Sequence, residues 1–167
     1  RSQGQTTLCD FPTHPSALPA TKQTVFIQAL KSAKKGIFIT ASMINGRITA
    51  MHTNVFEYLE QTLSRLPEEV AIRDSGRSLT FSDLHTTALS GATRILEKNP
   101  EKNQPIAIFL PKSSEALIAV CSILASGNCY VPLDIKSPES RLSAILDSLG
   151  NPLVVTKTEF QETLVRL

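Results

Sequence analysis

Apolar side chains recur every three or four residues from position 55 onward, the spacing of one face of an α-helix. The run lies in "NVFEYLEQTLSRLP" and ends at Pro67, a residue type that stops helices. We therefore expect a helix that ends before Pro67. Its apolar face would consist of Val55, Phe56, Leu59, Leu63 and Leu66.

Two short strands and a longer helix are expected next. "VAIRD" and "SLTF" have strand-like composition and are joined by a turn at Gly76. Within "LTFSDL", Thr80 and Asp83 have the spacing of a capping box, in which each side chain accepts a hydrogen bond from the backbone N–H of the other residue. The helix that begins there would end near Pro100.

Beyond Pro100, runs typical of strands and helices alternate regularly. Strands are expected in "PIAIFL", "CYVPL" and "PLVVT", with helices over 114–126, 138–149 and from 159 onward. Such alternation predicts parallel βαβ units with right-handed crossovers, so the predicted fold class is α/β with a parallel sheet. The helix "SEALIAVCSILAS" is apolar nearly all round, and we expect more than one of its faces to be covered.

Charge is distributed unevenly along a chain of ordinary globular composition. Of its 167 residues, 41% are hydrophobic and 19% charged, which suffices for one packed domain. Residues 1–50 carry six Lys and Arg against the single acid Asp10, whereas residues 51–167 carry eleven against fourteen acids. The first fifty residues are also rich in Ser and Thr, with three prolines within eight positions. We expect 1–50 to be a poorly structured leader or a non-native extension upstream of Met51, and 51–167 to form the domain.

Several classes of partner are excluded by the same composition. No stretch approaches the about 18 consecutive apolar residues of a membrane span, and the acidic body has no basic patch with interleaved aromatics for nucleic acid. The cysteines Cys9, Cys121 and Cys129 form no CxxC pair. The last two lie in apolar patterns, where cysteine is usually a small buried hydrophobe, and this favours a reducing, cytoplasmic location.

The stretch "LASGNCYVPLD" at residues 124–134 joins the apolar helix to a strand. Gly127 stands one residue beyond the helix, where a left-handed conformation satisfies the last carbonyls. Tyr130 and Val131 favour a strand, and Pro132, which has no N–H, fits a sheet edge or the last position of the strand. Local geometry therefore explains these residues without assigning them chemistry.

The next helix has clear start and stop signals. Ser137 is expected as its N-cap, with Pro138 as the first helical residue and Glu139 in the positive first turn. Gly150 would end it.

Three stretches resemble, in order, the motifs of one enzyme family. "LTFSDL" resembles L-[TS]-Y-x-E-L of the adenylate-forming (AMP-binding, acyl-activating) enzymes, which include the amino-acid adenylation domains of nonribosomal peptide synthetases. "LASGNCYVPLD" resembles the family's L-K-A-G-x-A-Y-V-P-[IL]-D, and "SPESRLSAIL" resembles P-x-x-R-L-x-x-I-L; together with the opening helix, the resemblance covers about residues 54–157. The positions of this chain in these motifs, all expected to have structural roles, are Leu79, Thr80, Phe81, Asp83, Leu84, Leu124, Gly127, Tyr130, Val131, Pro132, Asp134, Pro138 and Arg141.

The departures from the family pattern are mild. Phe81 replaces Tyr, Asp83 replaces Glu, Ser126 and Cys129 replace Ala, and Ala125 stands where Lys is common. They leave the substrate class open.

The resemblance implies an ATP-dependent ligase. In this family ATP and a carboxylate, here expected to be an amino acid, form an acyl-adenylate, and the acyl group passes to the thiol of coenzyme A or of a carrier-protein phosphopantetheine. The chemistry needs a donor-rich phosphate loop, an acidic residue that binds the ribose, a magnesium ion and a lysine.

The seven glycines are never closer than ten residues apart, so no glycine-rich phosphate loop is present. The resemblance places the family's loop, ribose-binding aspartate and catalytic lysine beyond residue 167. We therefore expect an amino-terminal fragment that contains no catalytic, cofactor-binding or metal-binding residues and is inactive alone.

A few residues are nevertheless candidates for chemistry. Lys112, Ser113 and Ser114 follow "PIAIFL" at the carboxyl end of a predicted parallel strand, the edge where α/β proteins bind ligands; the alternative is a loop with an N-cap serine and a solvated lysine. Asp134 follows its strand similarly, as a turn residue or a metal ligand. The histidines His14, His52 and His85 are isolated and lack zinc-like spacing.

Two functional hypotheses follow. The first is the opening part of an adenylation domain, whose partners are the rest of that domain and a carrier protein. The second is a non-catalytic α/β module that docks onto a carrier or ligase partner through the apolar helix at 114–126.

Overall fold

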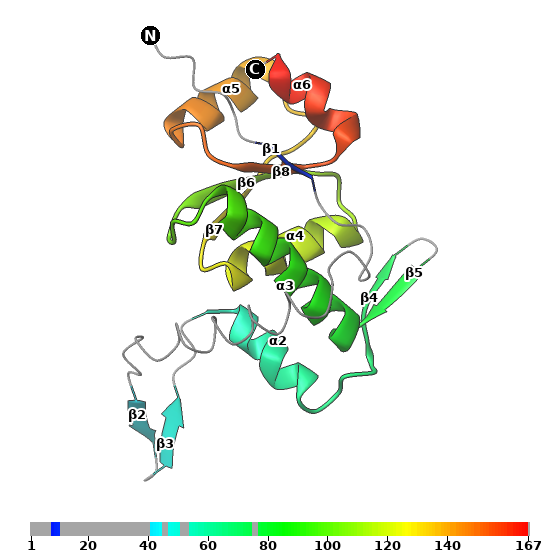
Figure 1. The fold of residues 1–167 in the computed structure, drawn as a ribbon, viewed down its shortest axis with the longest axis vertical. Coiled ribbons are helices and arrows are strands. Elements are labelled where there is room, and N and C mark those ends of the chain that lie inside the picture. The colour runs from blue at the N-terminus through cyan, green and yellow to red at the C-terminus, as the bar shows by residue number, and fades with distance from the viewer. Residues whose placement is uncertain (1–7, 11–40, 45–46, 51–53, 75–76, 167) are drawn as a thin grey trace.

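A parallel sheet lies at the centre of the fold (Figure 1). The computed structural model describes residues 8–10, 41–44, 47–50, 54–74 and 77–166. Four strands pair in the order β1-β8-β6-β7, all parallel; they are β1 (Leu8–Asp10), β8 (Val154–Thr156), β6 (Pro105–Phe109) and β7 (Cys129–Pro132). The predicted α/β class is thereby confirmed, as is the side-by-side placement of the three strands expected beyond Pro100.

Strand β6 divides the core into two clusters. Side chains alternate across a strand with a period of two, so one β6 residue faces one layer and the next residue faces the other. Ile106 and Ile108 belong to one buried cluster, while Ala107 and Phe109 belong to the second. All four are at most 4% exposed, as expected for a strand with neighbours on both sides.

Helices cover both faces of the sheet. In Figure 1, α3 (Phe81–Lys98) and α4 (Ser114–Ala125) lie on one face, and α5 (Glu139–Ser148) and α6 (Gln161–Val165) lie on the other. A short 3-10 helix, η3 (Thr158–Phe160), leads into α6. Each crossover helix thus buries its apolar side on the strands it connects.

The apolar helix α4 is covered on several sides, as its composition predicts. It packs on α3 and on β6, and helix α2 (Phe56–Leu63) approaches it from another direction. Ala88 and Ala92 of α3 are fully buried, and residues of this size allow two helices to pack closely. Leu117 remains 51% exposed, so part of one face of α4 is open.

Two antiparallel hairpins complete the described residues. Strands β4 (Val70–Asp74) and β5 (Arg77–Thr80) pair beside α3, and β2 (Ala41–Ile44) pairs with β3 (Arg47–Ala50). Strands β1, β2 and β3 therefore fall in the first fifty residues, whose remaining positions are outside the described ranges. The division of the chain at residue 50 stays a prediction.

Three local expectations need correction. Cys129 is exposed rather than buried, because β7 lies at one edge of the sheet. Helix α5 has Pro138 instead of Ser137 at its N-cap, and no side chain caps it. On the predicted apolar face of α2 only Phe56 is buried. Val55 is 67% and Leu66 46% exposed, and both lie outside the helix, which spans Phe56–Leu63.

Candidate functional site

The carboxyl edge of the sheet brings together residues from three separate segments. Strand β6 ends just before Lys112 and Ser113, and strand β8 ends at Thr156, directly before Lys157. The β4–β5 hairpin brings Asp74 and Arg77 to the same place. Parallel strands end at one edge of a sheet, which is why residues far apart in sequence meet here. We call Asp74, Arg77, Lys112, Ser113, Ser114, Glu115 and Lys157 the edge cluster.

The N-terminus of α4 is capped from two directions. The Ser113 hydroxyl accepts a hydrogen bond from the Ala116 amide at 3.4 Å, which makes Ser113 the N-cap. The Asp74 carboxylate, which comes from β4, accepts a hydrogen bond from the Ser114 amide at 2.8 Å. These bonds satisfy backbone donors that the first helical turn leaves unpaired.

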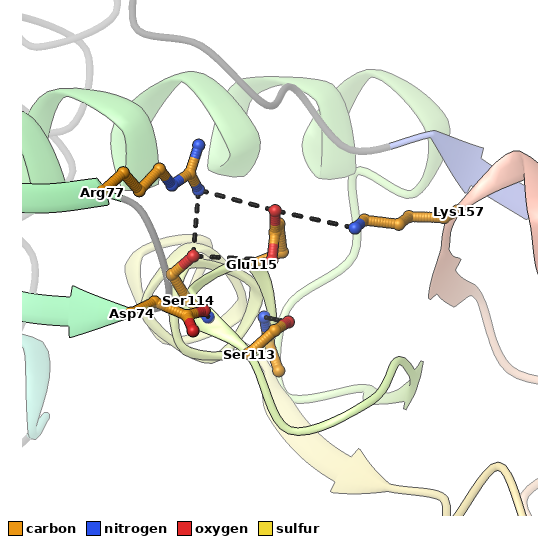
Figure 2. Close-up of polar contacts among 7 residues, drawn as sticks. Asp74, Arg77, Ser113, Ser114, Glu115 and Lys157 are labelled. Atoms are coloured by element: carbon orange, nitrogen blue, oxygen red, sulfur yellow. Dashed lines mark hydrogen bonds and ion pairs between the residues drawn. The ribbon is translucent and has the colours of Figure 1, made fainter.

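Glu115 pairs with two cations of the edge cluster. Its Oε1 atom lies 3.6 Å from Arg77 Nη2 and 3.6 Å from Lys157 Nζ. Figure 2 shows the two cations approaching the carboxylate from opposite sides. Arg77 Nη2 also donates a hydrogen bond to the Ser114 hydroxyl at 3.1 Å. One carboxylate therefore links the hairpin, helix α4 and the segment after β8.

The environment of Glu115 favours its charged form. Partial burial acts to raise the pKa of this carboxyl, but its own backbone N–H, the Ser113 hydroxyl, and the charges of Lys157 and Arg77 together lower that pKa below its ordinary value of 4.5. The carboxylate is thus ionised and paired at neutral pH.

All residues of the edge cluster except Lys157 line an open polar cavity of about 330 Å³. Two of its groups act against the binding of a phosphate at the N-terminus of α4. The amide at the helix N-terminus already donates to Asp74, and Glu115 supplies a second negative charge where a phosphate would approach. The nearest base to the two serines is the Glu115 carboxylate: the Ser114 hydroxyl donates a hydrogen bond to Glu115 Oε2 at 3.5 Å, and the Ser113 hydroxyl helps to lower the pKa of Glu115. A carboxylate with a lowered pKa is a weak base for activating a serine.

The described residues do not fit a magnesium or zinc site either. No group of three or more His, Cys, Asp and Glu side chains gathers among them. Asp134 accepts the Lys136 amide at 3.0 Å, which is a turn interaction. His85 stacks on Phe56 with ring centroids 5.6 Å apart, and its Nε2 lies 4.0 Å from Glu60. His14 and His52 lie outside the described residues.

The "LTFSDL" residues join the hairpin to α3. Thr80 and Asp83 form the capping box that the sequence predicts: the Asp83 amide donates to the Thr80 hydroxyl, and the Thr80 amide donates to Asp83 Oδ2, both at 3.1 Å. Leu79 and Leu84 are buried in the core cluster beneath α4.

The "LASGNCYVPLD" residues shape the turn into β7. Gly127 has φ +80°, the left-handed conformation expected after α4. The Leu124 carbonyl accepts a hydrogen bond from the Asn54 side chain at 2.7 Å, which ties the start of α2 to the end of α4. Tyr130 is 44% exposed, and Val131 packs against the second core cluster. Pro132 is the last residue of β7, where its missing N–H costs nothing.

An apolar groove lies between α2 and α4. It has a volume of about 310 Å³, and its walls are Val55, Phe56, Tyr58, Leu59, Thr62, Phe81, Val120, Cys121 and Leu124. Burial raises the pKa of the Cys121 thiol to about 11, so this cysteine is a neutral, apolar wall residue at physiological pH.

Sequence reasoning found part of the edge cluster and missed the rest. It named Lys112, Ser113 and Ser114 from their position after a strand, and the structure places all three at the cavity. It missed Asp74, Arg77, Glu115 and Lys157. Lys157 carried the same signal as Lys112, since it directly follows a predicted strand. The hairpin residues carried none, because their proximity depends on how the hairpin packs.

The fold and its motif residues define the class of protein. Residues 59–166, more than half of the chain, match the family described as AMP-binding enzyme, so the chain belongs to that family. No helix among the described residues is both long and apolar enough to cross a bilayer.

Its relatives are nonribosomal peptide synthetases. Over 102 residues, or 61% of this chain, it is 33% identical to gramicidin S synthase 2 of Brevibacillus brevis. Over 108 residues, or 65% of this chain, it is 30% identical to tyrocidine synthase 1 of Brevibacillus parabrevis. The matches span only 2% and 10% of those proteins.

Solved structures show the same fold. The nonribosomal peptide synthetase FmoA3 superimposes with a TM-score of 0.62 and 27% identity, over 66% of this chain and 12% of FmoA3. FmoA3 has also been solved in an AMPPNP-bound form.

Proposed function

We propose that this chain forms the amino-terminal part of an adenylation domain, whose complete form uses ATP and magnesium to activate an amino acid as its acyl-adenylate. The acyl group then passes to a thiol, on coenzyme A or on the phosphopantetheine of a carrier protein. Residues 51–167 would belong to this domain and residues 1–50 would lie outside it. The partners are the rest of the adenylation domain and the carrier protein, and the location is the cytoplasm.

The observation that carries this proposal is the match of residues 59–166 to the AMP-binding family, with peptide synthetases as relatives. The described residues supply the frame of such a domain: three strands of a parallel sheet with a helix layer on each face. We infer that they do not bind the nucleotide, because Asp74 accepts the first amide of α4 and Glu115 is paired with Arg77 and Lys157. We therefore assign this chain a structural part in catalysis.

Amino-acid-dependent ATP–pyrophosphate exchange tests the proposal in two ways. First, the isolated chain should give no exchange above a protein-free blank with any of the standard amino acids. Second, residues 59–166 should replace the matching segment of tyrocidine synthase 1 with measurable exchange retained. The control chimera carries Leu142→Asp, which places a charge in the core and should abolish the signal. Robust exchange by the isolated chain, or a folded chimera without exchange, would count against the proposal.

A second candidate function is a non-catalytic docking module. The observation in its favour is the apolar groove, whose wall residue Tyr58 is 56% exposed, together with Leu117 on α4, which is 51% exposed. Sedimentation velocity and binding of an apolar dye discriminate between the two. A stable monomer that binds no dye would eliminate this candidate.

A further inference from the structure

The two helices that form the walls of the apolar groove each contribute an apolar stripe to it. On α4 the wall residues Val120, Cys121 and Leu124 share one helical face, and Leu117, one turn earlier, extends this face at 51% exposure. On α2 the wall residues are Val55, Phe56, Tyr58, Leu59 and Thr62. An apolar groove of this kind is the surface that an amphipathic helix recognises, through side chains at every third or fourth position.

The charges of these two helices favour a basic occupant. Helix α2 carries Glu57 and Glu60, and neither α2 nor α4 contains Lys or Arg. The one charged residue of α4, Glu115, is already paired with two cations of the edge cluster. Opposite charges attract over about 10 Å at ordinary ionic strength, so positive charge on the exposed side of the occupant would be favourable beside α2.

One segment of this chain has the sequence of a basic amphipathic helix. In "TVFIQALKSAKK", residues 24–35, Phe26, Leu30 and Ala33 recur at helical spacing, and the only charged residues are three lysines. A glycine follows at position 36, where helices commonly end. The predicted helix has as many residues as α4 and would be about 18 Å long. Residues 24–35 lie outside those that the structure describes.

The β2–β3 hairpin connects this segment to the groove by a short path. Ala41 of β2 pairs with Ala50 of β3, and paired Cα atoms of antiparallel strands are about 5 Å apart. Four residues then lead from Ala50 to Asn54, a span of at most about 14 Å. The Asn54 side chain bonds to the Leu124 carbonyl, and the next residue is a wall of the groove. Residues that directly precede Ala41 are therefore held at high effective concentration near the groove.

We propose that residues 24–35 of this chain bind as a helix in the groove between α2 and α4. Phe26 and Leu30 pack against the α4 wall around Cys121, and the lysines remain on the solvent side. The contact joins an upstream segment to the part of the chain that matches the AMP-binding family. It requires neither ATP nor an amino acid, so it is independent of the proposed adenylation activity.

Cys121 makes the occupancy of the groove measurable, because its side chain is part of the wall. The fully reduced chain is treated with iodoacetamide, and alkylation of each cysteine is followed by peptide mass spectrometry. The double variant Phe26→Asp/Leu30→Asp places two charges on the apolar face of the segment, so the segment should leave the groove. Cys121 should then be alkylated at least about tenfold faster. The exposed Cys129 is the internal control, and its rate should stay unchanged.

The matched control is Gln28→Asp/Ser32→Asp, which adds the same two charges on the opposite face of the predicted helix. Its Cys121 should react at the parent rate. A synthetic peptide of residues 22–37, at millimolar concentration, should slow the reaction of Cys121 in Phe26→Asp/Leu30→Asp, and the same peptide carrying both of these substitutions should not.

Two results would overturn the proposal directly: equal Cys121 rates in the parent and both variants, or equal acceleration by both variants. A third is protection of Cys121 that rises with protein concentration, together with a dimer in sedimentation velocity. In that case a second copy of the chain, and not residues 24–35, would occupy the groove.

Discussion

Glu115 illustrates how a single side chain acquires its properties from its neighbours. Its identity and its place in the first turn of a helix are visible in the sequence, and an acid there is favourable because the N-terminus of a helix is positive. Its two cationic partners come from 38 positions earlier and 42 positions later in the chain, so the ion pairs exist only in the folded protein. Stability that depends on Glu115 should therefore depend on pH.

We expect Glu115→Gln to lower the free energy of unfolding by about 1 kcal/mol at pH 7, the amount typical of partly exposed ion pairs. The folded-state pKa of Glu115 is lowered, so its contribution is complete above about 4.5 and is lost as the pH falls through the folded-state pKa. Urea unfolding of both proteins between pH 7 and pH 3 measures this, and the two curves should converge at the acid end. The solvent-exposed Glu101→Gln should match the parent throughout; a Glu115→Gln deficit that persists at pH 3 would mean lost packing instead of lost charge.

At the scale of elements, α3 shows how far local sequence signals reach. The capping box at Thr80 and Asp83 was predicted from spacing alone and is present, because all of its atoms lie within four residues. Both strands of the β4–β5 hairpin were likewise predicted, as was the helix over 114–126. The N-cap of α5 was misplaced by one residue, since the Ser137 amide is held in a turn by the Asp134 carbonyl.

Thr80→Ala should destabilise the protein by about 1 kcal/mol, because it leaves an amide of the first turn of α3 without its acceptor. Thr80→Ser keeps the hydroxyl and should restore most of the loss. Thr93→Ala is the matched control: its hydroxyl only donates to the Leu89 carbonyl within the same helix, and its cost should stay below about 0.5 kcal/mol. Thermal and urea unfolding give these values, and equal losses for Thr80→Ala and Thr93→Ala would show that the cap contributes nothing.

At the scale of the whole molecule, the sheet joins two apolar clusters into one structure. Ile118 lies in the cluster beneath α3 and α4, and Leu142 lies in the cluster beneath α5 and α6, each about 1% exposed. Adjacent residues of β6 contribute to opposite clusters, so both clusters require the same strand to be in place. The two faces should therefore unfold together.

Ile118→Ala and Leu142→Ala should each cost about 2–5 kcal/mol, from lost burial and the cavity left behind. The two sites share no cluster, so the double variant should show the sum to within about 0.5 kcal/mol. Far-ultraviolet circular dichroism and tyrosine fluorescence should report one coincident transition for each variant that folds. Separate transitions for the two probes would show that the faces unfold independently. Val165→Ala, at a residue 78% exposed, should have little effect.

The sequence determined by itself the features that depend on short-range geometry. Hydrophobic periodicity placed the strands and helices beyond Asn54, turn residues marked Gly127 and Gly150, and the ordered motifs indicated the family. These features follow from contacts within a few residues, where the backbone leaves few alternatives.

The tertiary structure alone decided which strand lies at an edge and which side chains meet. The exposure of Cys129, the ion pairs of Glu115 and the covering of β8 by Leu8–Asp10 all depend on strand order. Strand order is set by the packing of segments that are many residues apart. The same short apolar sequence can form an edge strand or a central strand of a sheet, and only the segments that pack beside it decide which of the two it forms.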